Sequence, residues 1–237
     1  MSNGHGILDT IFDQLSPVHP DGHKFVAIAA VVTLLFFFFY PPLGWICAGI
    51  TAWVIYFFRD PQRVTPLRPG LVVSAADGKI SSIETVVPPI EMGMGPEPRV
   101  RISTFLSIFD VHIQRAPVAG NVVRSLYIPG KFVNAALDKA SEDNERRLMV
   151  IGTPTDGEVG VVQIAGLIAR RIISFVETGE AVGIGQRFGL IRFGSRVDIY
   201  LPPGKTALVS VGQRAIAGET VFADLHSVEP EREARRA

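Results

Sequence analysis

The chain has 237 residues, with 23 acidic and 23 basic side chains and a single cysteine. A formal charge of zero argues against binding to a nucleic-acid backbone, which requires a basic excess or a concentrated basic stripe. Cys47 alone cannot form an intramolecular disulfide, and the five histidines form no HExxH motif or other metal-ligand pattern. The composition therefore predicts neither a nucleic-acid partner nor a metal site.

The first distinctive segment is an uncharged hydrophobic block at residues 25–58, which follows a polar leader at residues 1–24. Of its 34 residues, 28 are hydrophobic and 7 are phenylalanine. Pro41 and Pro42 divide the block into two segments of 16 residues, each about 24 Å long as a helix, against a bilayer core of roughly 30 Å. The block predicts a membrane-associating helical hairpin. The alternative is a hairpin buried in a soluble core.

Basic residues flank this block on both sides. Lys24 precedes it, and three arginines follow between residues 59 and 68. Because positive charges near membrane segments favour the cytoplasmic side, both ends of the hairpin are expected at the cytoplasmic face of the cell membrane.

After a proline-rich linker at residues 59–70, the pattern predicts a β-domain at residues 71–228 and a charged tail at residues 229–237. Short β-branched runs alternate with glycine, proline and Asp-Gly turns, which is typical of an all-β sandwich or barrel with few helices. The expected strands are Leu71–Ser74, Lys79–Val87, Arg99–Thr104, Gly120–Tyr127, Leu148–Thr153, Gly157–Ile164, Ala169–Phe175, Arg187–Phe193, Arg196–Leu201, Ala207–Val211 and Thr220–Leu225. The expected helices are Leu106–Val111 and Phe132–Ala140.

Ala76–Ile80 and Pro117–Val122 each place a tight turn and a glycine before a strand, which resembles a weak internal repeat. Val211–Val221 resembles the strand-and-turn pattern of lipoyl or biotinyl domains, but the carrier lysine of those domains is missing from the tips of the turns. The fold expected is thus a mainly β hybrid of sandwich and barrel with lipoyl-like elements. A non-enzymatic, membrane-anchored adaptor with a lipoyl-like domain also fits this pattern and the hairpin.

A Gly-Ser dipeptide, Gly194-Ser195, joins two strand-like runs between residues 189 and 202. By itself such a pair indicates a bulge or a tight bend. In its wider context, however, the segment resembles the Gly-Ser self-cleavage site of phosphatidylserine decarboxylases in their short bacterial form. Further motifs of that form stand in the family's order at residues 58–61, 76–78, 105–112, 128–135 and 144–146. The resemblance extends from about residue 25 to about residue 224.

The resemblance implies a pyruvoyl enzyme that makes its cofactor from its own backbone. The Ser195 hydroxyl would attack the Gly194 carbonyl, and the resulting ester would break by β-elimination. The dehydroalanine left at position 195 would hydrolyse to a pyruvoyl group and ammonia. The products would be a β chain of residues 1–194 and an α chain of residues 195–237, which stay together as a heterodimer and could form a higher oligomer. A Schiff base between this group and phosphatidylserine would then lose carbon dioxide and give phosphatidylethanolamine.

Two further residues are assigned to the site. His112 is expected to move protons, either in the elimination or at the α-carbon of the substrate; a structural histidine is the alternative. Asp77 matches the family's Asp-Gly motif, although a turn aspartate would look the same. The chain departs from the long-form relatives at Arg115, where they carry a second histidine used in self-cleavage. Their aspartate, histidine and serine triad therefore cannot be transferred whole.

The lipid headgroup requires cations near its phosphate. The candidates, each with ordinary surface charge as its alternative, are Lys131, Arg115, Arg124, Arg146 and Arg147. A related serine lipid such as archaetidylserine would make the same demands as phosphatidylserine. A soluble pyruvoyl amino-acid decarboxylase is a further enzymatic alternative, which the block at residues 25–58 disfavours.

Overall fold

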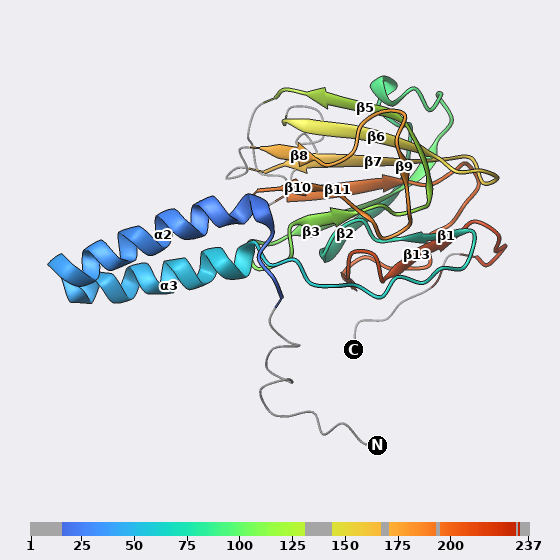
Figure 1. The fold of residues 1–237 in the computed structure, drawn as a ribbon. Helices are drawn as coiled ribbons and strands as arrows, with labels where there is room; N and C mark the ends of the chain where they lie inside the picture. The colour runs from blue at the N-terminus through green and yellow to red at the C-terminus, as the bar shows by residue number, and fades with distance from the viewer. Residues whose placement is uncertain (1–15, 131–143, 167–170, 193–194, 231, 233–237) are drawn as a thin grey trace, which may run out of the picture. The chain divides into compact units, whose positions relative to one another are not determined.

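The computed structural model describes residues 16–130, 144–166, 171–192, 195–230 and 232 (Figure 1). The chain divides into two compact units, residues 1–62 and residues 63–237. The described helices α2 and α3 belong to the first unit, and the β-strands belong to the second. The boundary falls inside the predicted linker.

The first unit contains the predicted helical hairpin, formed by α2 (Pro20–Phe39) and α3 (Pro41–Phe57). The break between the helices lies at Tyr40, whose backbone is not helical and whose N–H donates to the Phe36 carbonyl at 2.7 Å. Pro41 then opens α3, at a position where the missing N–H of proline costs no helical hydrogen bond. The predicted division at the two prolines is confirmed.

Helix α2 begins at Pro20, earlier than the predicted start at Phe25. His19 caps this end because its Nδ1 accepts the Asp21 N–H at 3.3 Å. Pro20 and Asp21 are also favourable in a first helical turn, the proline by its fixed backbone angle and the carboxylate by its charge. The residues that determine where α2 begins therefore precede the hydrophobic block.

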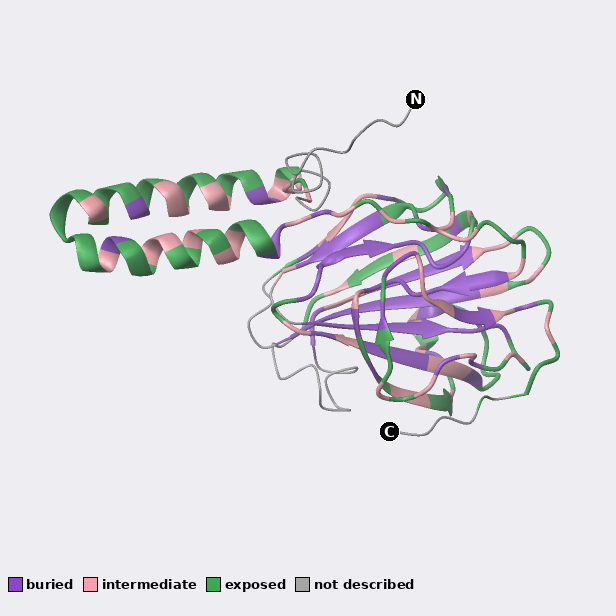
Figure 2. Ribbon diagram, turned by 90° about the horizontal axis from the view of Figure 1, so that it is seen from below, coloured by how far each residue is buried: buried purple, intermediate pink, exposed green. Residues whose placement is uncertain are grey.

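Helix α2 has 20 residues and is long and apolar enough to cross a membrane, whereas the apolar helix α3 has 17. Much of the hydrophobic surface of the hairpin is exposed (Figure 2): Phe38, Phe39 and Trp45 are 82, 75 and 73% exposed. Inside the hairpin, the hydroxyls of Thr33 and Thr51 lie 2.9 Å apart. A contiguous exposed apolar surface of this kind is typical of segments that contact lipid or another protein.

Within the described residues, the second unit contains three antiparallel sheets. The large sheet has eight strands in the order β12-β2-β3-β11-β7-β6-β5-β9 and curls into half a barrel (Figure 1). The smaller sheets have the orders β4-β10-β8 and β1-β13. The strands are β1 (Leu71–Val73), β2 (Gly78–Val86), β3 (Arg99–Leu106), β4 (Ile113–Arg115), β5 (Gly120–Ile128), β6 (Arg146–Gly152), β7 (Glu158–Ala165), β8 (Ile172–Ser174), β9 (Ala181–Val182), β10 (Arg187–Ile191), β11 (Ser195–Tyr200), β12 (Arg214–Ala215) and β13 (Val221–Asp224). A single turn of 3₁₀-helix, η1, covers Ile90–Met92. The predicted mainly β architecture with few helices is confirmed.

The helix predicted at Leu106–Val111 is wrong. Strand β3 continues to Leu106, and a tight turn follows in which Asp110 Oδ2 accepts the Ser107 N–H at 2.8 Å. The Asp110 N–H also donates back to the Ser107 carbonyl at 2.9 Å, which closes a local turn, and the chain enters β4 at Ile113 without forming a helix. The other predicted helix, Phe132–Ala140, lies outside the described residues.

The strand predicted at Ala207–Val211 is also wrong. The segment is irregular, with the Leu208 N–H donating to the Phe222 carbonyl at 2.8 Å. Ala207 and Val209 are buried in the main core. Their apolar character therefore reflects burial of a loop, which the alternating pattern does not distinguish from a strand.

The segment that resembles lipoyl domains, Val211–Val221, pairs in the large sheet with the turn-and-strand segment Ala76–Ile80. In the β2–β12 pair, Arg214 lies opposite Lys79 and Ala215 opposite Gly78. The Gly218 N–H donates to the Ser74 carbonyl at 2.8 Å. Segments more than a hundred residues apart thus form one edge of the sheet.

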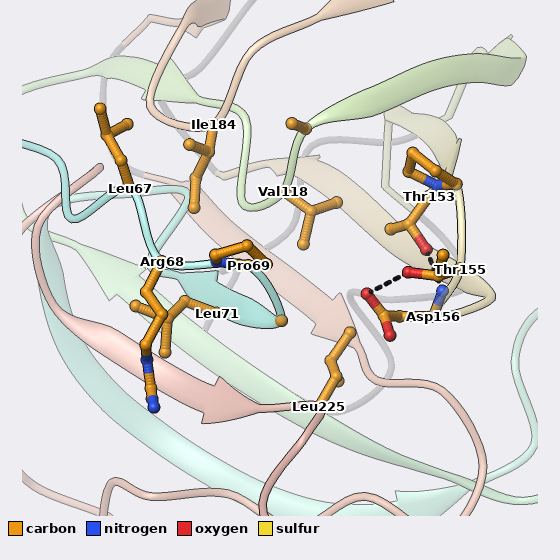
Figure 3. Close-up of a pocket in the computed structure, with 13 residues that line it drawn as sticks. Leu67, Arg68, Pro69, Leu71, Val118, Thr153, Thr155, Asp156, Ile184 and Leu225 are labelled. Atoms are coloured by element: carbon orange, nitrogen blue, oxygen red, sulfur yellow. Dashed lines mark hydrogen bonds between the residues drawn. The ribbon is translucent and has the colours of Figure 1, made fainter.

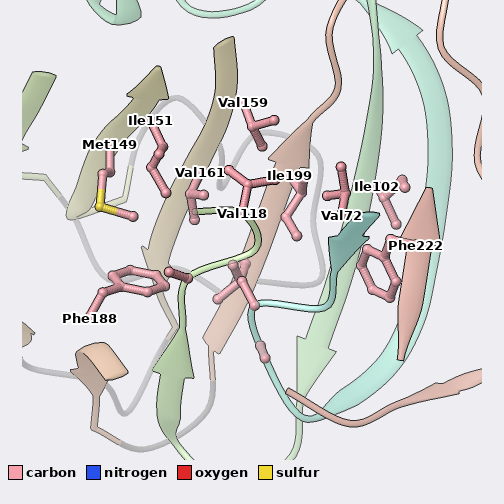
Figure 4. Close-up of a cluster of buried hydrophobic side chains, with 14 of the residues drawn as sticks. Val72, Ile102, Val118, Met149, Ile151, Val159, Val161, Phe188, Ile199 and Phe222 are labelled. Atoms are coloured by element: carbon pink, nitrogen blue, oxygen red, sulfur yellow. The ribbon is translucent and has the colours of Figure 1, made fainter. Parts of the chain in front are cut away.

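The main core fills the space on one face of the large sheet (Figure 4). Because successive side chains of a strand point to opposite faces, Val197 and Ile199 of β11 belong to this core. Tyr200 belongs to a smaller cluster with Val162 and Ile164. Ser195 has the same parity as Val197 and therefore lies on the face of the main core.

Candidate active site

Ser195 is the first residue of β11 and is completely buried. It lies opposite Leu106 of β3 on one side and opposite Ala165 of β7 on the other. Among the described residues, its hydroxyl has no hydrogen-bond partner. A buried polar group without a partner is costly and often marks a reactive position. Gly194, the other residue of the predicted cleavage site, lies outside the described residues.

Several motif-bearing segments meet at the same end of the large sheet as Ser195. The register continues from Lys79 opposite Phe105 to Gly78 opposite Leu106, and from Arg146 opposite Ile164 to Glu145 opposite Ala165. Since neighbouring strands are about 4.8 Å apart, Gly78 is about 10 Å from Ser195, two strands away. The structure therefore brings the Asp-Gly motif close to the predicted cleavage site.

Gly78 is required where it stands. A Cβ atom at this position would lie 2.1 Å from the Phe105 carbonyl oxygen, far inside van der Waals contact. The close approach of β2 and β3 beside Leu106 thus depends on a residue without a side chain. The glycine of the Asp-Gly motif has a packing role as well as a turn role.

His112 is buried and follows the turn that leaves β3. Its Nδ1 lies 2.9 Å from the Asp110 carbonyl oxygen. Because a carbonyl only accepts, Nδ1 carries the hydrogen, and a neutral ring therefore has its lone pair on Nε2. This tautomer leaves Nε2 as the nitrogen suited to accept a proton.

Hydrogen bonds connect the His112 backbone to the strands around Ser195. The His112 carbonyl accepts the Ile191 N–H at 3.3 Å, at the end of β10, the strand that leads toward the predicted cleavage site. It also accepts Gln114 Nε2 at 2.8 Å, and Gln114 Oε1 accepts Gln163 Nε2 at 2.9 Å. Gln163 lies opposite Val197 in the large sheet. His112 is thus held by both sheets that meet near residue 195.

This pair of buried glutamines is not among the residues predicted from the sequence. Both are almost completely inaccessible to solvent, and Gln163 lies in β7, whose other residues are largely apolar. A single polar residue within an otherwise apolar strand would indicate a buried side chain with a specific partner, and Gln163 fits this pattern. Gln114 lies in the three-residue strand β4, which the pattern did not predict.

Asp77 lies in the turn before β2 and is bound on both carboxylate oxygens. Oδ2 is 2.7 Å from Arg63 Nη2, and Oδ1 accepts the Ala217 N–H at 2.8 Å. Burial raises the pKa of Asp77 above its ordinary value, the Arg63 guanidinium opposes this rise, and Asp110 adds to it. Arg63 therefore takes part in the environment of Asp77, whereas the sequence predicted it only as a basic residue that flanks the membrane hairpin.

Arg115, at the position where the long-form relatives carry a second histidine, is buried and makes hydrogen bonds to two loops. The residue is 7% exposed, and its Nη1 donates to the Gly185 carbonyl at 3.0 Å. Its backbone N–H donates to the Ala75 carbonyl at 2.9 Å. These contacts tie the turn before Asp77 to the loop after β9.

The other headgroup candidates that the structure describes have protein partners. Arg124 donates to the Glu91 carbonyl at 3.1 Å, and Arg146 lies 3.2 Å from the Glu91 carboxylate. Arg147 donates to Ser125 Oγ at 3.1 Å. A phosphate would have to compete with these contacts. Lys131 lies outside the described residues.

The opposite face of β11 carries a buried ion pair. Arg196 binds Asp198 through two contacts of 2.9 Å. Burial and Asp198 raise the pKa of Tyr200 to about 12, against the opposing effect of Arg101. Tyr200 is therefore neutral at physiological pH. The side chains of Arg196 and Asp198 lie on the face of β11 opposite to the face that carries Ser195.

A cavity of about 280 Å³ lies at the other end of the large sheet (Figure 3). Thr153 and Asp156, from the hairpin between β6 and β7, form its polar side, and Val118, Ile184 and Leu225 form its apolar side. The strands β6 and β7 reach Ser195 with their opposite ends. In the part of the chain that the structure describes, no three metal-ligating side chains come together.

Removing Arg63 should make ionisation of Asp77 more costly. Because the folded-state pKa of Asp77 is raised, Asp77 contributes stability that is fully present below its ordinary pKa of 3.8 and is lost as the pH rises through the folded-state value. Arg63→Met removes the cation that holds this pKa down, so the loss should be larger and extend to higher pH. The measurement is the free energy of unfolding in urea at about pH 3 and pH 7.

The comparison uses Arg63→Met, Asp77→Asn and the double variant, all in a Ser195→Ala background that keeps the chain in one state. Arg68→Met, which removes the exposed partner of Asp224, is the control. Equal effects of Arg63→Met on the pH dependence with aspartate and with asparagine at position 77 would contradict the coupling.

Two comparisons with known proteins identify the family of this chain. The family model described as phosphatidylserine decarboxylase matches residues 50–223. The phosphatidylserine decarboxylase proenzyme of Nitrobacter winogradskyi is 58% identical over 216 residues, which cover 91% of this chain and 87% of the relative. Membership of an enzyme family argues against the non-enzymatic adaptor. The chain belongs to the phosphatidylserine decarboxylase family, whose members are carboxy-lyases.

Proposed function

We propose that this chain decarboxylates phosphatidylserine to phosphatidylethanolamine, using a pyruvoyl group made from Ser195 by self-cleavage after Gly194. The observation that carries the proposal is the buried Ser195 hydroxyl, which has no partner among the described residues and lies at the start of an internal strand. The proenzyme name of the relative from Nitrobacter winogradskyi agrees with processing of this kind.

The residues around position 195 fit a pyruvoyl group. Its carbon atoms come from Ser195 itself, and the neighbours Leu106 and Ala165 are fully buried and apolar. A dry, apolar surrounding protects a reactive carbonyl from water and strengthens nearby hydrogen bonds. When present, the group supplies a ketone that condenses with the substrate amine and takes up the electrons released with carbon dioxide.

For self-cleavage, Ser195 Oγ attacks the carbonyl carbon of residue 194, and the bond to the Ser195 nitrogen breaks to leave an ester. Removal of the Ser195 α-proton then expels the carboxylate of residue 194. Water replaces the nitrogen at position 195, which leaves as ammonia. The Ser195 hydroxyl has no hydrogen-bond partner among the described residues, so none of their contacts must be broken for the first step.

His112 is the proposed proton carrier for the decarboxylation. Its Nδ1 is fixed by the Asp110 carbonyl, and the ring is therefore oriented with Nε2 as the exchangeable position. Asp77 is the proposed helper at the neighbouring turn, where its carboxylate holds Arg63 and the Ala217 N–H. In this role Asp77 orders the turn that carries Gly78 and keeps a negative charge near the site.

The proposed domain organisation keeps the leader at residues 1–24, the hairpin at residues 25–58, the linker at residues 59–70, the catalytic β-domain at residues 71–228 and the charged tail at residues 229–237. After cleavage, β11, β12 and β13 would belong to the α chain, and each is paired with strands of the β chain. The two chains would therefore remain a heterodimer.

The mature protein should consist of two chains that meet at Gly194 and Ser195, and Ser195→Ala should remain one chain of 25.7 kDa without activity. The reason is that alanine has no hydroxyl to attack the preceding carbonyl. Intact mass spectrometry under denaturing conditions measures this directly. An uncleaved wild type with full activity would exclude the pyruvoyl mechanism.

His112→Ala should still cleave but should decarboxylate phosphatidylserine about 10²-fold more slowly, the scale typical of losing a general acid or base. His226→Ala is the matched control, since His226 pairs with Asp156 beside the cavity at the other end of the sheet. Steady-state kinetics and chain composition are measured together. An uncleaved His112→Ala chain would assign the residue to maturation, and normal kinetics would make it structural.

We also propose that the hairpin anchors the protein to the cytoplasmic face of the cell membrane, where the lipid substrate lies. The exposed apolar surface of α2 and α3 supports this location. The full-length protein should sediment with membranes after a high-salt wash, because apolar burial is insensitive to charge screening. Deletion of residues 25–58 should release the β-domain. Full-length protein that stays soluble without detergent would favour a hairpin buried against protein.

A further inference from the structure

The direction in which the main chain of residue 195 forms its hydrogen bonds follows from the strand register. In an antiparallel ladder, opposite residues alternate between pairs that exchange both N–H to C=O bonds and pairs that exchange none. The Leu201 N–H donates to the Val100 carbonyl at 2.9 Å, so this pair is hydrogen-bonded. From this pair the register of β11 against β3 continues without a shift to Ser195, which lies opposite Leu106. Ser195 is six positions before Leu201, an even number, so Ser195 and Leu106 also form a hydrogen-bonded pair.

The hydrogen bonds of β7 lead independently to the same orientation of the Ser195 main chain. The Ala165 N–H donates to the Glu145 carbonyl at 2.9 Å, and the Ala165 carbonyl accepts Asn144 Nδ2 at 2.7 Å. Both main-chain groups of Ala165 therefore point away from β11. The pair Ala165 and Ser195 exchanges no hydrogen bonds, which leaves the N–H and C=O of Ser195 directed toward Leu106.

We propose that the main-chain N–H of Leu106 is a catalytic hydrogen-bond donor in the decarboxylation. It donates to the carbonyl oxygen of residue 195, which is conjugated with the ketone carbon formed at that position and gains negative charge as carbon dioxide leaves. This inference rests on the proposed pyruvoyl mechanism and adds a named donor to it.

Cleavage leaves this bond in place. The Ser195 nitrogen is lost as ammonia, so the bond from its N–H to the Leu106 carbonyl disappears. The carbonyl carbon and oxygen of residue 195 remain attached to Arg196. The Leu106 N–H therefore stays opposite its acceptor in the two-chain protein.

The donor is well suited to stabilise charge. Leu106 is completely buried, and β3 holds it between β2 and β11, so the N–H needs no reorganisation when charge develops. In a dry environment such a hydrogen bond is stronger than in water. Loss of one donor of this type typically lowers kcat about 10²- to 10³-fold.

The test replaces a single amide by an ester. The α-hydroxy acid analogue of leucine at position 106 removes the N–H and keeps the side chain. The matched control is the analogue of isoleucine at position 102, because Ile102 is equally buried and, by the same alternation, forms a hydrogen-bonded pair with Ile199. Each variant loses one ladder bond of the same two strands, so their stabilities should fall equally.

Both esters are made in the full-length protein in detergent, and three quantities are measured: chain composition, the rate of reaction with phenylhydrazine, and the kinetics on phosphatidylserine. The ester at position 106 should lower kcat about 10²-fold with little change in KM, and should slow the phenylhydrazine reaction, because the ketone loses an electron-withdrawing contact. The ester at position 102 should change both rates less than about twofold. Equal effects at the two positions would overturn the proposal.

Hydrogen exchange of the cleaved wild type tests whether the Leu106 N–H is hydrogen-bonded, even if an ester variant fails to cleave. The Leu106 amide should be as protected as the Ile102 amide, although Ser195 no longer donates to Leu106. Rapid exchange at Leu106 would overturn the proposal. A wild type that forms no phenylhydrazine adduct would instead refute the pyruvoyl mechanism, so the two failures are distinguishable.

Discussion

Pairing of β11 on both sides, with β3 and with β7, determines where residue 195 lies and what surrounds it. A strand end is normally the part of a sheet that frays most easily. Here the end is fixed by two registers without a shift, and the buried pair of Arg196 and Asp198 occupies the opposite face. A one-residue slip would turn Ser195 away from the main core, so the register itself specifies the reactive position.

The remaining contacts of the site follow from that end of the sheet. The turn after β3 presents His112, and the turn before β2 presents Asp77 beside Arg63. The hydrogen bond between Gln114 and Gln163 joins the small sheet to the large one, and Gln163 lies opposite Val197, two residues after Ser195. Several of these groups come from segments far apart in the chain. The chemistry proposed for this chain thus depends on long-range strand pairing more than on any one local motif.

Local signals explain which features were predictable. The double proline after Tyr40 and the uncharged block defined the hairpin, and glycine-bounded β-branched runs located most strands. Asp110 was mistaken for part of a helix because its side chain completes a turn that periodicity does not register. The role of Arg63 and the contact between the two glutamines depend on tertiary pairing, which one sequence does not reveal. The Gly-Ser motif indicated the site, whereas its burial between Leu106 and Ala165 required the fold.

The central claim is that residue 195 begins an internal strand that stays paired after the chain is cut. Native mass spectrometry of the wild type in detergent tests it most directly, followed by the same measurement in denaturant. The account predicts equal numbers of the two chains in every native species, with the small chain released only on denaturation. A small chain that dissociates from the native protein would contradict it, because β11 would then not be held by β3 and β7.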